Sequence, residues 1–283
     1  YTTGNTLSLH DALPIWDDVT YVNCAHTGAP LARGGLARLD PEGRARRAIY
    51  VHDVIPIDHP EFQRPGSGAR LARFLAAVAG PRTQFFANSE ATARRLDRYA
   101  GDAGWTVAPA IALRPTLAPR TRPPALDLCR AAVRELVEGA RPFLLTLGTI
   151  EPRKNHAMLL HLWRAGLGAD EASPLLVVAG RRGWENATVF AMLDRAPALA
   201  ETVREFGDLS DVEVDALLTA TRALLAPSFA EGLCIPVLEA AARGAPVIAA
   251  DLPALREVAP PGGVFLDPLD GPGWRRAILR RCA

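Results

Sequence analysis

The sequence predicts an α/β fold in which parallel strands alternate with helices, arranged in two domains. The length of 283 residues exceeds the roughly 100–200 residues of one typical domain. Short, nearly continuous apolar runs alternate with amphipathic stretches, and this alternation is typical of a parallel sheet covered on both faces. Ligands of such sheets bind outside the carboxyl ends of the strands, so the loops that follow the strands are the places to look for function.

The composition excludes several classes of protein. Hydrophobic residues make up 49% and charged residues 22%, which suits a folded core rather than a disordered chain. The net charge of +1 argues against a strongly basic nucleic-acid module, and no apolar run approaches the roughly 20 residues of a membrane helix. The four Cys are scattered without a CxxC pair, and no secretory signal is visible. We therefore expect a reducing, cytoplasmic environment.

The strands and helices of the second half follow from periodicity and helix-end signals. Ser210 and Glu213 are spaced as a capping box, Asn155 is a candidate N-cap, and Pro236 suits the first position of a helix that Gly244 ends. The predicted strands are 143–147, 175–179, 203–206, 223–226 and 246–250, and the predicted helices are 155–166, 210–220 and 236–243.

The first half shows a shorter version of the same pattern. Its predicted strands are 48–51 and 83–87, and its predicted helices are 69–79 and 91–99. Residues 115–124 contain four Pro and no periodicity, which is typical of a linker. We predict a partial N-terminal domain at 16–114, a linker at 115–141 and a second domain at 142–283.

The two ends of the chain differ from the rest. Residues 1–15 resemble one translated frame of a short-read sequencing adapter, so we interpret them as an assembly artefact that is not native. The C-terminus stops inside a predicted helix. Our expectation is a fragment of a longer protein.

A pair of cations marks the first candidate site. Arg153 and Lys154 lie between the strand at 143–147 and the following helix, and Lys154 is the single Lys among the 32 basic residues. Two fixed cations beside the positive end of a helix favour an anion, phosphate in particular. The pair alone is equally compatible with a solvated helix start.

A second candidate site is the segment from Glu231 to Glu239. Glu231 lies in the loop after the strand at 223–226, and Glu239 lies in the predicted first turn of the next helix. The backbone amides of 232–235 precede that helix and can hold an anion, while the two carboxylates can accept hydrogen bonds from hydroxyls. A sugar, a diphosphate and a ribose together offer this sequence of groups.

These segments resemble those of retaining glycosyltransferases with the GT-B fold, family 4. The spacing of Glu231 and Glu239 matches the Glu-x7-Glu motif of that family, and residues 148–155 resemble its donor-phosphate segment. Further matching segments are 51–56, 88–90, 207–210, 226–228, 244–248 and 255–258, so the resemblance covers about residues 20–275. It implies two Rossmann-like domains whose parallel sheets face each other across a cleft, with the N-terminal one incomplete here.

The resemblance also implies a role for each site residue. Gly148, Arg153 and Lys154 would bind the donor diphosphate, with charge-assisted contacts to the leaving group. Glu231 and His52 would be catalytic, and Glu239 would hold the ribose. The amides that contact the donor sugar would be those of Gly232, Leu233, Cys234 and Ile235.

The subgroup of this family that carries these motif sequences is similar to mannosyltransferases of surface-polysaccharide assembly. It implies transfer of a hexose, mannose above all, with retention of configuration, through an oxocarbenium-like state and with neither metal nor cofactor. GDP-mannose is the favoured donor, a UDP-sugar the other, and the acceptor a glycan or lipid-linked glycan. The partners would include no nucleic acid, and the protein could contact the inner membrane face peripherally.

Two departures from the family pattern keep other functions open. Cys234 stands where the family has Gly, a residue that lets the backbone approach phosphate closely. The Gly-rich loop expected after the first strand is missing. The alternatives are a GT-B-type sugar-nucleotide 2-epimerase and an inactive nucleotide-sugar-binding protein. A Rossmann dehydrogenase is disfavoured because no GxGxxG follows a strand.

Overall fold

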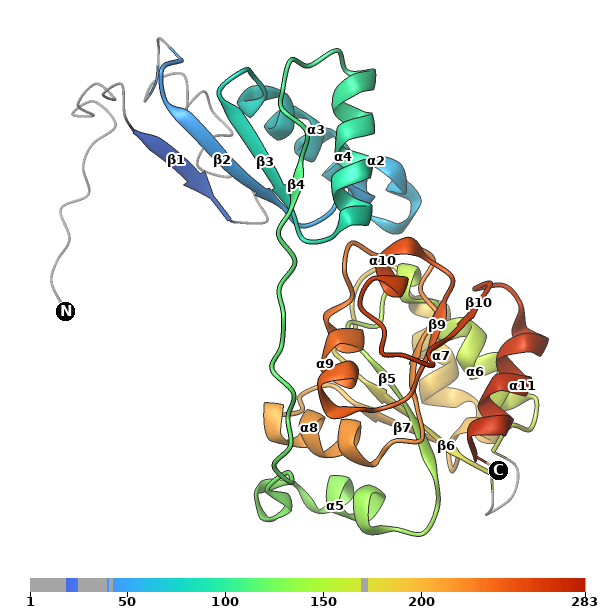
Figure 1. Cartoon of the computed structure of the whole chain (residues 1–283). Coiled ribbons are helices and arrows are strands. Elements are labelled where there is room, and N and C mark those ends of the chain that lie inside the picture. Colours follow the sequence, from blue (N-terminus) through green and yellow to red (C-terminus); the bar gives the residue numbers. More distant parts are fainter. Residues whose placement is uncertain (1–18, 25–39, 41–42, 169–172, 283) are drawn as a thin grey trace, which may run out of the picture. The chain divides into compact units, whose positions relative to one another are not determined.

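The computed structural model describes residues 19–24, 40, 43–168 and 173–282, so the interpretation of 1–15 as an artefact lies outside the described residues. The chain divides into two compact units, Tyr1–Pro115 and Thr116–Ala283. Both contain parallel strands and helices (Figure 1), which confirms the predicted α/β class with two parallel sheets. The division falls at the start of the proline-rich segment.

The first unit contains a parallel four-stranded sheet in the order β1-β2-β3-β4. Its strands are β1 (Thr20–Asn23), β2 (Arg46–Val51), β3 (Thr83–Ala87) and β4 (Ile111–Ala112), and its helices are α2 (Ile55–Asp58), the 3-10 turn η2 (Pro60–Phe62), α3 (Ser67–Val78) and α4 (Glu90–Asp102). Alternate residues of β2 and β3, such as Ile49 and Phe85, pack against Leu75 of α3 and Leu96 of α4. The predicted strands at 48–51 and 83–87 are confirmed.

The second unit contains a parallel six-stranded sheet in the order β10-β9-β8-β5-β6-β7. Its strands are β5 (Phe143–Leu147), β6 (Leu175–Ala179), β7 (Val203–Phe206), β8 (Leu224–Ala226), β9 (Val247–Ala250) and β10 (Val264–Leu266). The order reverses at β5, which pairs with β6 on one side and with β8 on the other. Such a switch point places two strand-following loops side by side at the carboxyl edge of the sheet.

Helices cover both faces of this sheet, as Figure 1 shows. They are α5 (Ala131–Glu138), α6 (His156–Arg164), α7 (Ala187–Arg195), α8 (Asp211–Ala220), α9 (Ile235–Arg243), α10 (Pro253–Arg256) and α11 (Gly271–Cys282), with 3-10 turns η3 (Leu126–Leu128), η4 (Pro152–Lys154) and η5 (Pro197–Leu199). One core packs α5, α8 and α9 on the sheet and the other packs α6, α7 and α11. The inner strands β5, β6, β8 and β9 are buried on both faces, which explains their continuous apolar sequences, whereas the edge strands β7 and β10 are partly exposed.

Two helix starts test the capping predictions. The capping box of Ser210 and Glu213 is confirmed, with the Ser210 hydroxyl accepting from the Glu213 amide and the Glu213 carboxylate accepting from the Ser210 amide. The prediction that Asn155 is an N-cap is wrong. Its backbone has φ +55°, and its side-chain amide donates to the carbonyls of Pro227 (3.2 Å) and Pro268 (2.9 Å). Asn155 therefore connects three loops instead of capping α6.

Residues 116–141 carry structure of their own. Helix α5 lies within this range, and Arg130, just before it, donates to the Glu213 carboxylate at 2.6 Å. This contact ties the segment to α8 of the second unit. In the part of the chain that the structure describes, no helix has the length and apolar character needed to cross a membrane.

Candidate functional site

The loops after β5 and β8 meet at the switch point of the six-stranded sheet. The β5–α6 loop carries Arg153 and Lys154, and the β8–α9 loop carries Glu231. A backbone hydrogen bond of 2.9 Å from the Phe229 amide to the Arg153 carbonyl fixes one loop against the other. The topology thus brings together residues that are more than seventy positions apart in the sequence.

Glu231 is the centre of a buried ionic cluster. Its carboxylate accepts from Arg153 Nη1 at 2.8 Å, from Lys154 Nζ at 2.7 Å and from the Ser228 hydroxyl at 2.6 Å. Arg153 also donates to Glu151 at 2.6 Å, and the Glu231 side chain is only 5% exposed. We call these five residues the Glu231 cluster. It contains two cations and two carboxylates, so the four charges balance.

The charges of the cluster stabilise one another against burial. Burial alone would raise the pKa of Glu231, but the positive charges of Lys154 and Arg153 outweigh it and hold this pKa below its ordinary value. Burial likewise lowers the pKa of Lys154, and Glu231 raises it above its ordinary value. Glu231 and Lys154 are therefore both ionised at neutral pH.

The cluster retains donors for a ligand. A lysine ammonium has three N–H donors and a guanidinium has five, more than the contacts with Glu231, Glu151 and the Ala230 carbonyl require. The Arg153 and Lys154 side chains are each 15% exposed. They can therefore contact an anion at the sheet edge without giving up their carboxylate partners.

Sequence reasoning missed Glu151 and Ser228 as members of the cluster. Both stand inside motifs that were singled out, Glu151 in 148–155 and Ser228 in 226–228, and both are buried. A signal was available for Glu151, because a buried arginine requires a carboxylate partner. No spacing in the sequence pointed to the hydroxyl of Ser228.

Gly148 lies directly beside Lys154. Its φ of +134° is a conformation that other residues rarely adopt, and a Cβ there would stand 3.6 Å from Lys154 Cε. The end of the next strand approaches much more closely, because a Cβ at Gly180 would stand 1.9 Å from the Gly148 carbonyl oxygen. Glycine at 148 is thus favoured by the backbone conformation, and glycine at 180 by the close packing of the two strand ends.

The segment that precedes α9 has a strained backbone at Cys234. Gly232, Leu233 and Cys234 are buried, whereas Ile235 is 56% exposed. Cys234 has φ +69°, in the left-handed region where side chains other than that of glycine are disfavoured. Burial raises the pKa of its thiol to about 12, so the thiol stays protonated. A glycine at position 234, as in the family pattern, would adopt this backbone conformation without strain.

This strain gives a stability prediction. Replacing Cys234 by Gly or by Ala removes the same sulfur contacts, but only glycine relieves the positive φ. We expect Cys234→Gly to be more stable than Cys234→Ala by about 1 kcal/mol in denaturant unfolding. An alanine variant as stable as the glycine variant would contradict the strain.

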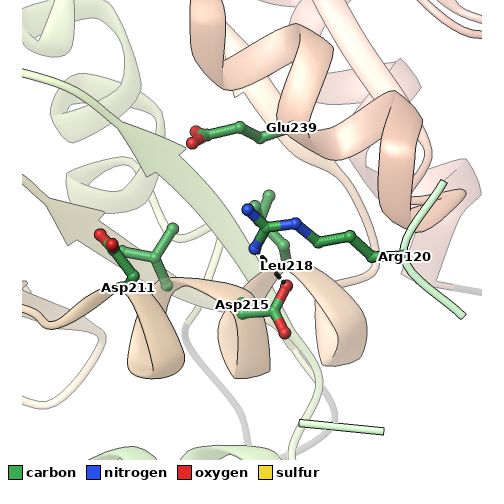
Figure 2. A pocket seen from close by; sticks show the side chains of 6 residues that line it. Arg120, Asp211, Asp215, Leu218 and Glu239 are labelled. Atoms are coloured by element: carbon green, nitrogen blue, oxygen red, sulfur yellow. Dashed lines mark hydrogen bonds and ion pairs between the residues drawn. The ribbon is translucent and has the colours of Figure 1, made fainter. Parts of the chain in front are cut away.

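The position of Glu239 within its helix differs from the prediction. It is the fifth residue of α9 and so lies in the second turn, not the first. Its side chain lines a cavity of about 110 Å³ together with Arg120 and residues of α8, as Figure 2 shows. Burial raises the pKa of the Glu239 carboxyl, with Arg120 opposing this shift and Asp211 adding to it.

His52 belongs to the first unit. It follows β2 directly, its Nε2 lies 3.1 Å from the Cys24 carbonyl oxygen, and its ring meets Tyr50 edge-on at 5.0 Å. The position at a strand end is as predicted, and a role toward a bound sugar stays a prediction.

His156, the first residue of α6, is a buried imidazole next to the cluster. Burial and the charge of Lys154 lower its pKa to about 4, so the ring is neutral at physiological pH. Neither ring nitrogen has a hydrogen-bond partner among the described residues. Within that same part of the chain, no group of three or more His, Cys, Asp or Glu side chains is arranged to hold a metal ion.

Comparison with known proteins agrees with the geometry. Residues 132–270 match the family described as Glycosyl transferases group 1. O-antigen chain mannosyltransferase B of Escherichia coli is 33% identical over 128 residues, which are 45% of this chain and 33% of that protein. The serotype-specific mannosyltransferase WbdA of Escherichia coli is 27% identical over 225 residues, 75% of this chain and 26% of that protein. The chain therefore spans about a quarter to a third of these relatives.

Solved structures give the fold. Anabaena HepE in complex with UDP and glucose superposes with a TM-score of 0.66 at 17% identity, covering 93% of this chain and 67% of that one. A trehalose-phosphate synthase from Burkholderia xenovorans gives a TM-score of 0.69 at 12% identity, covering 97% and 68%. The chain thus has the GT-B fold, and its residues 132–270, which include the Glu231 cluster and Glu239, match the glycosyl transferases group 1 family.

Proposed function

We propose that the chain is part of a retaining mannosyltransferase that uses a nucleotide-sugar donor, GDP-mannose above all, and extends a surface glycan. The single observation that carries the proposal is the Glu231 cluster at the carboxyl edge of the six-stranded sheet. At this edge of the sheet, the two cations suit the diphosphate of a nucleotide-sugar, and the carboxylate suits the hydroxyls of its sugar. The relatives' names, both mannosyltransferases, favour transfer over epimerisation and mannose over other hexoses.

Each residue has a role in the proposed reaction. Arg153 and Lys154 stabilise the charge that develops on the leaving diphosphate, and Gly148 gives the phosphates room beside Lys154. Glu231, ionised and fixed by three donors, accepts hydrogen bonds from the sugar hydroxyls. Glu239 holds the ribose, the amides of 232–235 contact the donor, and His52 contributes to the sugar site from the first unit.

The proposed step is a displacement on one face of the sugar. The bond from C1 to the phosphate oxygen breaks and a bond from C1 to an acceptor oxygen forms on the same side. The acceptor's proton passes to the departing phosphate oxygen. No metal or cofactor takes part in this step. The acceptor is a glycan or lipid-linked glycan, and the protein acts in the cytoplasm, in peripheral contact with the membrane face that carries such acceptors.

The experiment is transfer from GDP-mannose to a mannose-terminated oligosaccharide, with the product linkage read by NMR. An α-linked product is expected, because GDP-mannose is an α-glycoside. Glu231→Gln should lower the rate at least about 100-fold, while the Asp251→Asn variant, altered in an exposed ion pair, serves as the matched control. A β-linked product would contradict retention. Donor binding without transfer or hydrolysis would favour an inactive binding protein.

A further inference from the structure

The connecting segment at the start of the second unit is fastened to α8 and α9 by a set of arginine contacts. The Arg120 amide donates to the Ala242 carbonyl at 2.8 Å. Arg243, at the end of α9, donates to the backbone carbonyls of Arg120 (2.9 Å) and Arg122 (2.6 Å). These contacts fix the segment against the C-terminal end of α9.

The side chains of this junction form a charged network. Arg243 binds the carboxylate of Asp215 on α8 through Nε and Nη2, and Arg120 Nη1 donates to the same carboxylate at 3.1 Å. The Arg243 side chain is 8% exposed and that of Asp215 is 11% exposed. Asp215 is thus a buried anchor that both arginines share.

Arg120 and Asp215 of this network line the same cavity as Glu239. Figure 2 shows the Arg120 guanidinium reaching toward Asp215 in the cavity whose other wall carries Glu239. The groups that face Glu239 there are Arg120 from the connecting segment and Asp211 and Asp215 from α8. Among the residues that the structure describes, Arg120 is the one cation that lines the cavity beside these three carboxylates.

From this arrangement we infer that Arg120 is a positioning residue of the donor site: held by Asp215, its positive charge in the cavity that Glu239 lines favours the ionised carboxylate that would receive the ribose hydroxyls. The segment that joins the two units is then a structural part of nucleotide binding, with Asp215 and Arg243 holding Arg120 itself. The inference rests on the proposed function, in which Glu239 receives the ribose. It adds a residue that lies well outside the Glu-x7-Glu segment.

The inference predicts a pH effect with a definite sign. Burial and Asp211 already raise the pKa of Glu239, and Arg120 lowers it. Removing Arg120 takes away the lowering contribution, so this pKa rises further. A hydrogen bond from ribose to an ionised carboxylate is then lost at a higher pH than in the unmodified protein.

The experiment measures the Kd of GDP-mannose by calorimetry between pH 5 and pH 8 on the full chain. Arg120→Ala should weaken binding roughly 5-fold at neutral pH, and the midpoint of its pH dependence should move upward. Arg120→Lys, which keeps the charge, should restore part of the affinity. Arg122→Ala is the matched control, because it removes an exposed charge of the same segment and keeps the carbonyl that Arg243 binds.

Each outcome separates the inference from the proposed function. Absence of GDP-mannose binding in the unmodified chain would overturn the proposed donor site. Normal binding there, with Arg120→Ala matching it in both Kd and pH midpoint, would overturn the role of Arg120 alone. Equal losses in Arg120→Ala and Arg122→Ala would mean a general charge effect and would also overturn it. Thermal unfolding of each variant shows whether α9 remains folded.

Discussion

Glu231→Gln is expected to lower the free energy of unfolding by about 3 kcal/mol, because it leaves buried cations without their shared carboxylate. Lys154 loses the charge that its ammonium contacts at 2.7 Å, whereas Arg153 keeps Glu151. Urea unfolding monitored by circular dichroism measures the change. A loss of activity in this variant is therefore interpretable only beside its measured stability.

A double-mutant cycle tests the cause. Lys154→Met removes the cation, so the variant with both Lys154→Met and Glu231→Gln should be more stable than Glu231→Gln alone, by about 2 kcal/mol. Asp251→Asn, in the exposed pair with Arg256, should leave stability nearly unchanged. Strictly additive effects of the two substitutions would mean that Lys154 and Glu231 do not interact in the folded protein.

His156 is expected to make the stability of the second unit fall as the solution becomes acidic. The pKa of His156 is about 4 in the folded protein and 6.5 when unfolded, so between these values only the unfolded chain binds the proton. Stability is therefore complete above pH 6.5 and is lost as the pH falls toward 4. The expected loss between pH 7 and pH 5 is about 2 kcal/mol.

Thermal unfolding at a series of pH values measures this loss. A loss of that size corresponds to a decrease in Tm of about 5 °C for a unit of this size. His156→Gln should remove this part of the pH dependence, whereas His161→Gln, on the exposed side of the same helix, should retain it. A His156→Gln variant with the slope of the unmodified protein would show that another group is responsible.

Strands β5, β6, β8 and β9 could be predicted from the sequence because burial on both faces gives continuous apolar runs, whereas the partly buried edge strand β10 was missed. The capping box of Ser210 and Glu213 was equally visible, since it depends on residues three positions apart. Asn155 was misjudged because its side-chain partners, the carbonyls of Pro227 and Pro268, come from distant loops. A sequence motif indicates contacts between neighbouring residues, and only the folded structure shows where contacts with distant residues replace them.

In the candidate site, too, the motifs could be found in the sequence, whereas the contacts between them could not. The segments around Arg153 and Glu231 were evident as motifs, but their joining into one ionic cluster depends on the neighbouring positions of β5 and β8. Ser228 and Arg120 could not be singled out, because their importance lies in contacts across the fold. Cys234 was visible as a departure from a glycine pattern, and its positive φ supplies the physical reason.

The central claim is that the Glu231 cluster binds the diphosphate of a nucleotide-sugar. The most direct test is thermal unfolding of the chain with GDP, UDP, GDP-mannose or UDP-glucose, beside the Lys154→Met/Glu231→Gln variant. At about 100 times its Kd, a ligand adds roughly 2.7 kcal/mol of stability. We predict such stabilisation by GDP and GDP-mannose in the unmodified chain and its loss in the variant. Equal stabilisation of both proteins, or none by any nucleotide, would contradict the claim.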